Sequence, residues 1–411
     1  MRQGFVAVLL LCLAACSQQP NAAVSPLPSR SQSPVAANVN ALPAPAGYSN
    51  KGPLAVVLNI GGVGETYYIH LLATDGSGGP FVTPKSRSLK MYYFPPASCP
   101  AGGMCAGAET AAYNLPEVSI SSTRVYYLDG ETQIRALSSD GAQQDVMNVD
   151  APANTQVIFS VSPDDSRIAI AAITLATTNS AASFHDVMYV EDTGTAAHRV
   201  DIYSSTTRAE WPVAWRSGKL VVGVGPVDLG SYDTQYGAIG YHVVDPGTGL
   251  RAASLDCVQG LLSPAGVACI TGFCTGGTTC GPGTVGKQGY DGAKTTFELP
   301  AGPPPRIFTA FQKGAGLSPD GQRIAAPGYP TDSSQTTGDT YLISGGSANL
   351  LTHAGSPLGW IDDTHLVLGN GRQVYVIDTA NPSNVLSEVS SLNVPNGIFA
   401  SVAGVLPTNL V

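Results

Sequence analysis

The chain has 411 residues, of which 12% are charged and 43% are hydrophobic, and it contains 47 glycines and 31 prolines. So many helix-breaking residues and so few charges exclude a coiled coil or a long helical bundle, and the hydrophobic content excludes disorder throughout. The formal net charge of −9, without any run of Lys or Arg, argues against a nucleic-acid partner.

The first sixteen residues predict export from the cytoplasm. Arg2 precedes an apolar stretch, residues 4–11, that is too short to cross a bilayer as a permanent helix. The ending Leu-Ala-Ala-Cys resembles the lipobox of bacterial lipoproteins, which implies that residues 1–15 are a signal peptide and that Cys16 is acylated. The alternative is an ordinary secretory signal with an incidental cysteine. We expect an extracytoplasmic protein, lipid-anchored to a bacterial cell membrane or outer membrane.

Residues 16–52 consist mainly of Ser, Pro, Ala, Asn and Gln and lack periodic apolar positions. This composition predicts a flexible, partly polyproline tether between the anchor and a folded domain. The folded domain is expected to occupy residues 53–411.

Six cysteines remain apart from Cys12 in the leader and Cys16, the expected site of acylation: Cys99, Cys105, Cys257, Cys269, Cys274 and Cys280. An even number in an oxidising compartment predicts disulfides, whose connectivity the sequence leaves open. Local pairing is the simplest scheme, since Cys99–Cys105 and Cys274–Cys280 each enclose five residues with a Gly-Gly. That scheme leaves Cys257 for Cys269. A zinc site is the alternative, but there is no C-x-x-C, and we expect neither a metal nor another cofactor.

From residue 53 onward the chain contains short runs of Val, Ile, Tyr and Thr that are bounded by Gly, Pro, Asp and Asn. Such runs predict strands separated by turns, and hence an all-β fold. Examples are residues 54–60, 124–128, 167–172, 219–224 and 373–378.

One motif recurs between these runs. Residues 161–169, with Ser-Pro-Asp-Asp, and residues 317–325, with Ser-Pro-Asp-Gly, agree at six of nine positions, and weaker copies lie near 217, 265 and 363. The motif resembles the WD40-like, TolB-type β-propeller repeat. That resemblance implies a tight hairpin between the first and second strands of a blade, in which Pro fixes one dihedral, Asp bonds the local backbone and Gly or Asn takes a positive φ.

The repeats predict a β-propeller of four-stranded blades. Units near residues 120, 165, 217, 265, 320 and 363 give six blades, and residues 54–94 supply strands of another. If the C-terminal strand at 398–404 pairs with the N-terminal strands, the ring closes with seven blades. Six or eight blades are the alternatives. TolB-type proteins carry an α/β domain before the propeller, whereas a tether is expected here, so a TolB-specific role is not implied.

Extra length is predicted between the second and third strands of four blades, at 174–184, 225–238, 271–295 and 327–339, and in the link 95–113. In an up-and-down blade these connections emerge on one face. They carry five candidate binding residues, Tyr113, Tyr232, Tyr236, Tyr290 and Tyr329, among small polar residues, as in antibody loops. The alternative is a set of tolerated surface insertions.

The sequence offers no catalytic set. Residues 316–320 do not complete G-x-S-x-G, and the close His/carboxylate neighbours, His185 with Asp186 and Asp362 with His365, are expected in strands or turns. The paired acids at 164–165 and 362–363 are interpreted as turn residues rather than Ca²⁺ ligands. The three tryptophans, Trp211, Trp215 and Trp360, are expected to pack between blades.

Function is therefore predicted as non-enzymatic. We expect a monomeric scaffold that binds an envelope protein or polymer, and the alternative is a propeller hydrolase or lyase acting on peptide or glycan.

Overall fold

The computed structural model describes residues 52–60, 67–85, 117–152, 155–178, 181–225, 238, 240–257, 260–271, 284–298, 306–307, 316–329, 339–344, 347–369, 373–381, 385–388 and 399–407. All of them belong to one compact unit, Val39–Val411. Within these residues the regular structure is entirely β-strand, and no helix suited to crossing a membrane is found among them.

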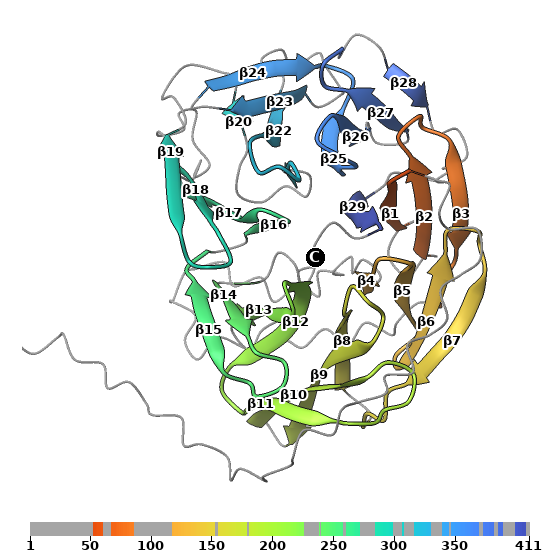
Figure 1. Cartoon of the computed structure of the whole chain (residues 1–411), viewed down its shortest axis with the longest axis vertical. Helices are drawn as coiled ribbons and strands as arrows, with labels where there is room; N and C mark the ends of the chain where they lie inside the picture. The colour runs from red at the N-terminus through yellow and green to blue at the C-terminus, as the bar shows by residue number, and fades with distance from the viewer. Residues whose placement is uncertain are drawn as a thin grey trace, which may run out of the picture. The chain divides into compact units, whose positions relative to one another are not determined.

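The strands pair into seven antiparallel sheets arranged around a centre, numbered blades 1 to 7 in ring order (Figure 1). Blade 1 contains β29 (Phe399–Leu406), β1 (Leu54–Ile60), β2 (Tyr67–Ala73) and β3 (Gly78–Val82). Blade 2 contains β4 (Val118–Ile120), β5 (Arg124–Asp129), β6 (Gln133–Ser138) and β7 (Gln143–Asn148). Blade 3 contains β8 (Thr155–Val161), β9 (Arg167–Thr178), β10 (Ala181–Asp192) and β11 (Val200–Ser205). Blade 4 contains β12 (Ala209–Arg216), β13 (Lys219–Gly225), β14 (Gly240–Val244) and β15 (Arg251–Leu255).

The remaining blades follow the same order, with one interruption. Blade 5 contains β16 (Leu261–Ser263), β17 (Gly266–Thr271), β18 (Thr284–Gln288) and β19 (Lys294–Glu298). Blade 6 contains β20 (Arg306–Ile307), β21 (Gly316–Leu317), β22 (Ile324–Tyr329), β23 (Asp339–Ser344) and β24 (Ser347–Thr352). Blade 7 contains β25 (Ser356–Trp360), β26 (His365–Gly369), β27 (Val374–Asp378) and β28 (Val385–Glu388). In blade 6 both β20 and β21 pair with β22, so its first strand is split into two short pieces.

The ring closes through its two terminal strands. β29 pairs antiparallel with β1, in a register that runs from Leu54 opposite Leu406 to Ile60 opposite Phe399. This pairing supplies blade 1 with its innermost strand, and it confirms both the predicted closure and the prediction of seven blades. It also covers the edge of β1 that would otherwise be free to pair with another chain.

The repeated motif forms the turn between the first and second strands, as predicted. Asp164 Oδ1 accepts a hydrogen bond from the Ser166 amide at 3.1 Å, and Asp320 Oδ1 accepts one from the Gln322 amide at 2.9 Å. The following residues take the positive φ that the turn needs, 63° at Asp165 and 68° at Gly321.

Apolar side chains from the strands pack between neighbouring blades. The largest cluster joins blades 3, 4 and 5 and contains the fully buried Trp211. Trp215 of blade 4 donates its indole N–H to Ser160 O of blade 3 at 3.1 Å, and Trp360 of blade 7 donates to Gly316 O of blade 6 at 2.8 Å. The predicted placement of the tryptophans between blades is confirmed.

Candidate functional site: the central channel and the loop face

The two faces of the propeller differ in their connections. On one face, which we call the clasp face, lie the turns between the first and second strands and between the third and fourth strands, each two to seven residues long. On the other, the loop face, lie the connections between the second and third strands and from each blade to the next. The loop-face connections include the much longer segments 83–117, 226–239 and 272–283.

A two-stranded ribbon extends blade 3 on the loop face. β9 and β10 pair from Arg167 opposite Asp192 out to Thr178 opposite Ala181, whereas the pairing of β9 with β8 ends at Thr174. The last four pairs therefore continue beyond the four-stranded sheet, by about 13 Å at the usual rise of a strand. The prediction of a loop at 174–184 is wrong, because the Thr- and Ala-rich segments pair as strands.

Two other loop predictions are wrong in extent. Residues 271–295 include the whole third strand of blade 5, β18, because its Gly- and Lys-containing sequence has a weak strand pattern. Residues 327–329 belong to β22 despite Pro327. Tyr329 is the last residue of that strand, and the structure does not describe its side chain.

Tyr290 was expected on the loop face but lies on the clasp face. It occupies the turn between β18 and β19, and its hydroxyl donates to Ser263 O at 2.8 Å. Burial raises the pKa of Tyr290. This side chain is therefore anchored within its own blade instead of standing among the loops.

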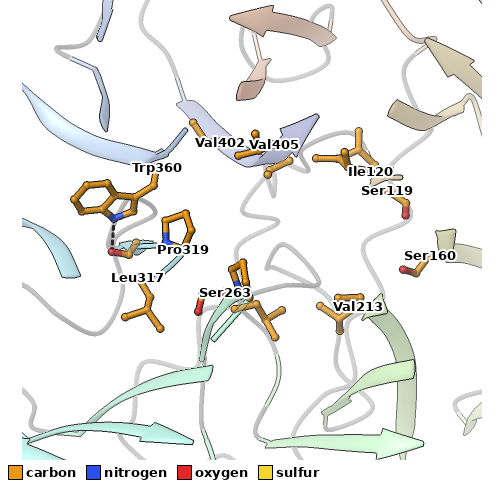
Figure 2. A pocket seen from close by; sticks show the side chains of 18 of the residues that line it. Ser119, Ile120, Ser160, Val213, Ser263, Leu317, Pro319, Trp360, Val402 and Val405 are labelled. Carbon is orange, nitrogen blue, oxygen red and sulfur yellow. Dashed lines mark hydrogen bonds between the residues drawn. The ribbon is translucent and has the colours of Figure 1, made fainter. Parts of the chain in front are cut away.

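The first strands of all seven blades surround a central cavity of about 160 Å³ (Figure 2). Each blade contributes at least one of the lining residues Ile120, Ser160, Val213, Leu262, Leu317, Leu358 and Val402. Three prolines of the hairpin turns, Pro163, Pro264 and Pro319, also line it. The repeated Ser-Pro motif thus shapes the channel as well as the turn.

Bulges direct three of the lining side chains toward the cavity. In β12, β25 and β29 the pairing with the second strand skips one residue, and the skipped residues are Val213, Leu358 and Ala403. All three line the cavity and are partly exposed. An extra residue in one strand of a pair re-aims its side chain, which explains how three separate blades present an apolar group at the axis.

None of the described residues that line the cavity has an ionisable side chain. The lining consists of Val, Ile, Leu, Ala, Gly, Pro and Trp residues together with Ser119, Ser160 and Ser263. Ser119 Oγ accepts the Val161 amide at 2.8 Å, and Ser263 Oγ donates to Gly266 O at 3.2 Å. A general acid, a general base or a base-activated nucleophile is not available from these residues.

A group of ionisable side chains lies away from the cavity, between blades 3 and 4. Asp186 is fully buried; its Oδ2 accepts the Glu210 amide at 2.7 Å, and its Oδ1 makes no hydrogen bond with a described residue. Burial, with a smaller contribution from the Glu210 charge, raises the pKa of Asp186 to about 8. Glu210 Oε1 accepts a hydrogen bond from Arg251 at 2.6 Å and lies 3.4 Å from His242 Nδ1. Sequence analysis singled out Asp186 only for its neighbour His185 and missed its partners in the next blade.

The His/carboxylate neighbours take structural positions. His185 and Asp186 are successive residues of β10, so their side chains point to opposite sides of the strand. His185 lies 3.3 Å from Ser204 Oγ. His365 Nδ1 lies 2.8 Å from Asp362 Oδ2 within the turn between β25 and β26. In the described part of the chain, no group of three or more His, Cys, Asp or Glu residues could hold a metal ion.

Several predicted residues fall outside the described part of the chain: Cys16, Cys99, Cys105, Cys274, Cys280, Tyr113, Tyr232 and Tyr236. Cys257 is described; it is almost fully buried and disulfide-bonded. Cys269 is a residue of β17, with its side chain outside the description. The proposed pairing of these two cysteines remains a prediction.

No protein-family model and no curated protein sequence matches the chain. Several solved structures resemble it distantly. The β-propeller domain of the Trilobed protease from Pyrococcus furiosus is 14% identical, with 64% of this chain and 81% of that chain covered and a TM-score of 0.37. Pyrococcus horikoshii acylaminoacyl peptidase is 12% identical, with 83% and 52% covered and a TM-score of 0.46. BamB from Moraxella catarrhalis is 14% identical, with 71% and 84% covered and a TM-score of 0.32.

The chain spans about half the length of the acylaminoacyl peptidase chain with which it aligns, 52%. Its assignment as a seven-bladed β-propeller rests on its own strand pairing.

Proposed function

We propose that this protein is a lipid-anchored, extracytoplasmic scaffold whose loop face binds a protein or polymer of the bacterial envelope without chemical turnover. In this proposal Cys16 carries the lipid, residues 16–52 form the tether, and the propeller acts as a monomer. The partner meets the segments that contain Tyr113, Tyr232 and Tyr236. No nucleic acid and no cofactor takes part.

The observation that carries the proposal is the difference between the two faces. Short turns on the clasp face bond to one another across blades, as where the Asp320 amide donates to Asp363 Oδ1 at 2.8 Å. On the loop face three connections, 83–117, 226–239 and 272–283, are much longer, and the β9–β10 ribbon extends beyond its sheet. Binding surfaces are commonly built from loops on a rigid scaffold, which favours the loop face as the contact surface.

The central channel supports binding over catalysis. A hydrolase or lyase that worked at the axis would need ionisable or nucleophilic groups near the substrate. The described part of the cavity lining provides three serines and contains no histidine, carboxylate or lysine. The chemistry of the lining therefore weighs against the propeller-enzyme alternative.

The anchor is tested by fractionation of cells that express the full chain. Cys16→Ala protein is expected to leave the membrane fraction in detergent-free extracts, while Cys257→Ala protein stays with it. Continued membrane association of the Cys16→Ala protein would show that the lipid-anchor proposal is wrong.

The binding face is tested by crosslinking and capture from envelope preparations. Deletion of residues 232–236 is expected to reduce recovery of crosslinked partner several-fold. Leu250→Ala changes a side chain that is 70% exposed on the clasp face, and it is expected to leave recovery unchanged. Equal recovery from the deletion variant and the wild-type chain would remove the support for a loop-face partner.

A further inference from the structure

We infer that the central cavity binds one small, uncharged and mostly apolar molecule that carries a single hydroxyl or carbonyl group. This second binding activity is independent of the partner proposed for the loop face. The inference rests on the size of the cavity, on the uncharged side chains that line it and on the positions of its few polar atoms.

The size of the cavity favours a ligand of about one ring. The cavity measures about 160 Å³. Pockets for drug-sized molecules usually measure about 300–1,000 Å³, whereas an apolar cavity of about 150 Å³ in another protein accommodates benzene. A single six-membered ring or a short branched alkyl group matches this space.

Charge on the ligand is disfavoured by the lining. Among the residues around the cavity that the structure describes, there is no Lys, Arg, His, Asp or Glu. A charged ligand would lose its hydration on entry and find no opposite charge in return. The contacts on offer come from aliphatic side chains such as Ile120, Val213 and Leu358.

Most polar atoms around the cavity are already engaged within the protein. The indole N–H groups of Trp215 and Trp360 donate to backbone carbonyls of the neighbouring blades. They are therefore unavailable to a ligand, although the indole rings form part of the wall.

One wall offers hydroxyl groups. Ser119 of blade 2 and Ser160 of blade 3 lie near each other on this wall (Figure 2). Ser119 Oγ accepts the Val161 amide at 2.8 Å and keeps its own hydrogen for donation. Ser160 Oγ makes no hydrogen bond to a described residue. This wall suits one hydroxyl or carbonyl group and leaves the rest of the ligand in apolar surroundings.

The apolar side chains are held in place by the backbone. Val213, Leu358 and Ala403 are presented by bulges in three different strands. Close contacts fix the strands themselves, since a Cβ added at Gly404 would lie 2.7 Å from Ile120 Cδ1. Because the site is preformed, binding a ligand does not carry the entropic cost of ordering these side chains.

The test uses the purified full chain and three probes that share one ring: cyclohexanol, cyclohexylamine and cyclohexanecarboxylate. Trp215 and Trp360 line the cavity, so tryptophan fluorescence reports on occupancy, and a concentration-dependent rise in Tm provides a second readout. Cyclohexanol is expected to give a saturable response in the millimolar range, at least ten-fold tighter than either charged probe. Absence of a saturable cyclohexanol response, or equal affinity for all three probes, would overturn the inference without any variant.

Two variants locate the response in the cavity. Val213→Phe and Leu358→Phe add bulk to the cavity from two separate blades, and each is expected to weaken cyclohexanol binding at least ten-fold. Leu250→Phe adds the same bulk at an exposed position and is expected to bind as the wild-type chain does. If both cavity variants bind cyclohexanol with wild-type affinity, the proposed site is wrong, whatever the result of the loop-face experiment.

Discussion

The phenol of Tyr126 in blade 2 donates a hydrogen bond of 2.8 Å to Asp165 Oδ1 in the hairpin of blade 3. The other carboxylate oxygen of Asp165 accepts a bond from Thr123 Oγ1 at 2.5 Å and lies 3.8 Å from Arg124. Burial, together with the nearby carboxylate, raises the pKa of Tyr126. Asp165 is the last residue of the Ser-Pro-Asp-Asp turn, and the blade 6 copy has Gly321 at this position. Asp165 thus joins two blades on the clasp face.

Removal of the Tyr126 hydroxyl is expected to destabilise the propeller. Tyr126→Phe leaves a buried carboxylate without one of its donors, and loss of a hydrogen bond to a charged group costs about 1.5–3 kcal/mol. Urea unfolding measures the change. Tyr203→Phe is the control, because its hydroxyl donates to the backbone carbonyl of Arg208 at an exposed position, where about 0.5 kcal/mol is at stake. Equal losses in the two variants would contradict a role for Asp165 in joining blades 2 and 3.

Asp186 is expected to make stability fall as pH rises. Its pKa is about 8 in the folded chain against an ordinary value of 3.8, so between pH 4 and 8 the folded state keeps a proton that the unfolded state has lost. Unfolding free energy therefore decreases as pH rises through this window. Asp186→Asn removes this pH dependence. From pH 5 to pH 9 the free energy of unfolding of the variant is expected to rise by roughly a few kcal/mol relative to that of wild type.

Unfolding by urea at several pH values provides the measurement for Asp186. Asp75→Asn, at an exposed turn where hydrogen bonds from Ser77 hold the pKa low, serves as the control and should keep the wild-type slope above pH 6. A slope that is the same in Asp186→Asn and wild type would show that this carboxyl is ionised in the folded chain.

Gly359 is expected to tolerate no side chain. Its φ is 153°, and an added Cβ would lie 2.6 Å from Val402 Cβ in the closing strand β29. Gly359→Ala combines backbone strain with overpacking between blades 7 and 1, which should cost about 2–4 kcal/mol. Gly218→Ala is the matched control, since Gly218 has a φ of 71° with no atom within 4 Å of the added Cβ. It should lose only about 1 kcal/mol.

Thermal unfolding and limited proteolysis at the C-terminus follow the effect of Gly359→Ala. Selective release of β29 in Gly359→Ala is the expected pattern. If the two glycine variants are equally stable, the contact between Gly359 and Val402 does not hold the ring closed.

The disulfide scheme is open to direct mapping. Digestion of the unreduced, alkylated chain followed by mass spectrometry is expected to give linked peptides for Cys99–Cys105, Cys257–Cys269 and Cys274–Cys280. Cys257 is disulfide-bonded in the structure, so its linked partner decides the scheme. A bond from Cys257 to any cysteine other than Cys269 would refute local pairing.

Sequence analysis predicted the architecture because hairpin chemistry is local. Pro163, Asp164 and the positive φ at residue 165 are requirements of one turn, and they repeat wherever that turn repeats. Closure by β29 could also be predicted. The C-terminal strand pattern has no neighbouring strands of its own, and the N-terminal strands offer a free edge with which it can pair. Blade number, strand order and the placement of the tryptophans could therefore be predicted from the sequence.

The candidate site could not be predicted from the sequence, because its features depend on strand register and on contacts between neighbouring blades. A one-residue bulge at Val213 leaves no trace in an alternating apolar pattern, and the same holds at Leu358. The partnership of Asp186 with Glu210 joins residues of different blades. Tyr290 was assigned to the wrong face because β18 went unrecognised. A single sequence gives no signal for these relationships.

Photo-crosslinking from both faces tests the scaffold proposal most directly. A benzoylphenylalanine placed at Thr178, on the β9–β10 ribbon of the loop face, is compared with one placed at Gln322, an exposed residue of the clasp face. Irradiation of intact cells is expected to give a defined adduct with an envelope component from Thr178 and none above background from Gln322. Equal adduct yields from the two faces, or an adduct from Gln322 alone, would contradict binding by the loop face.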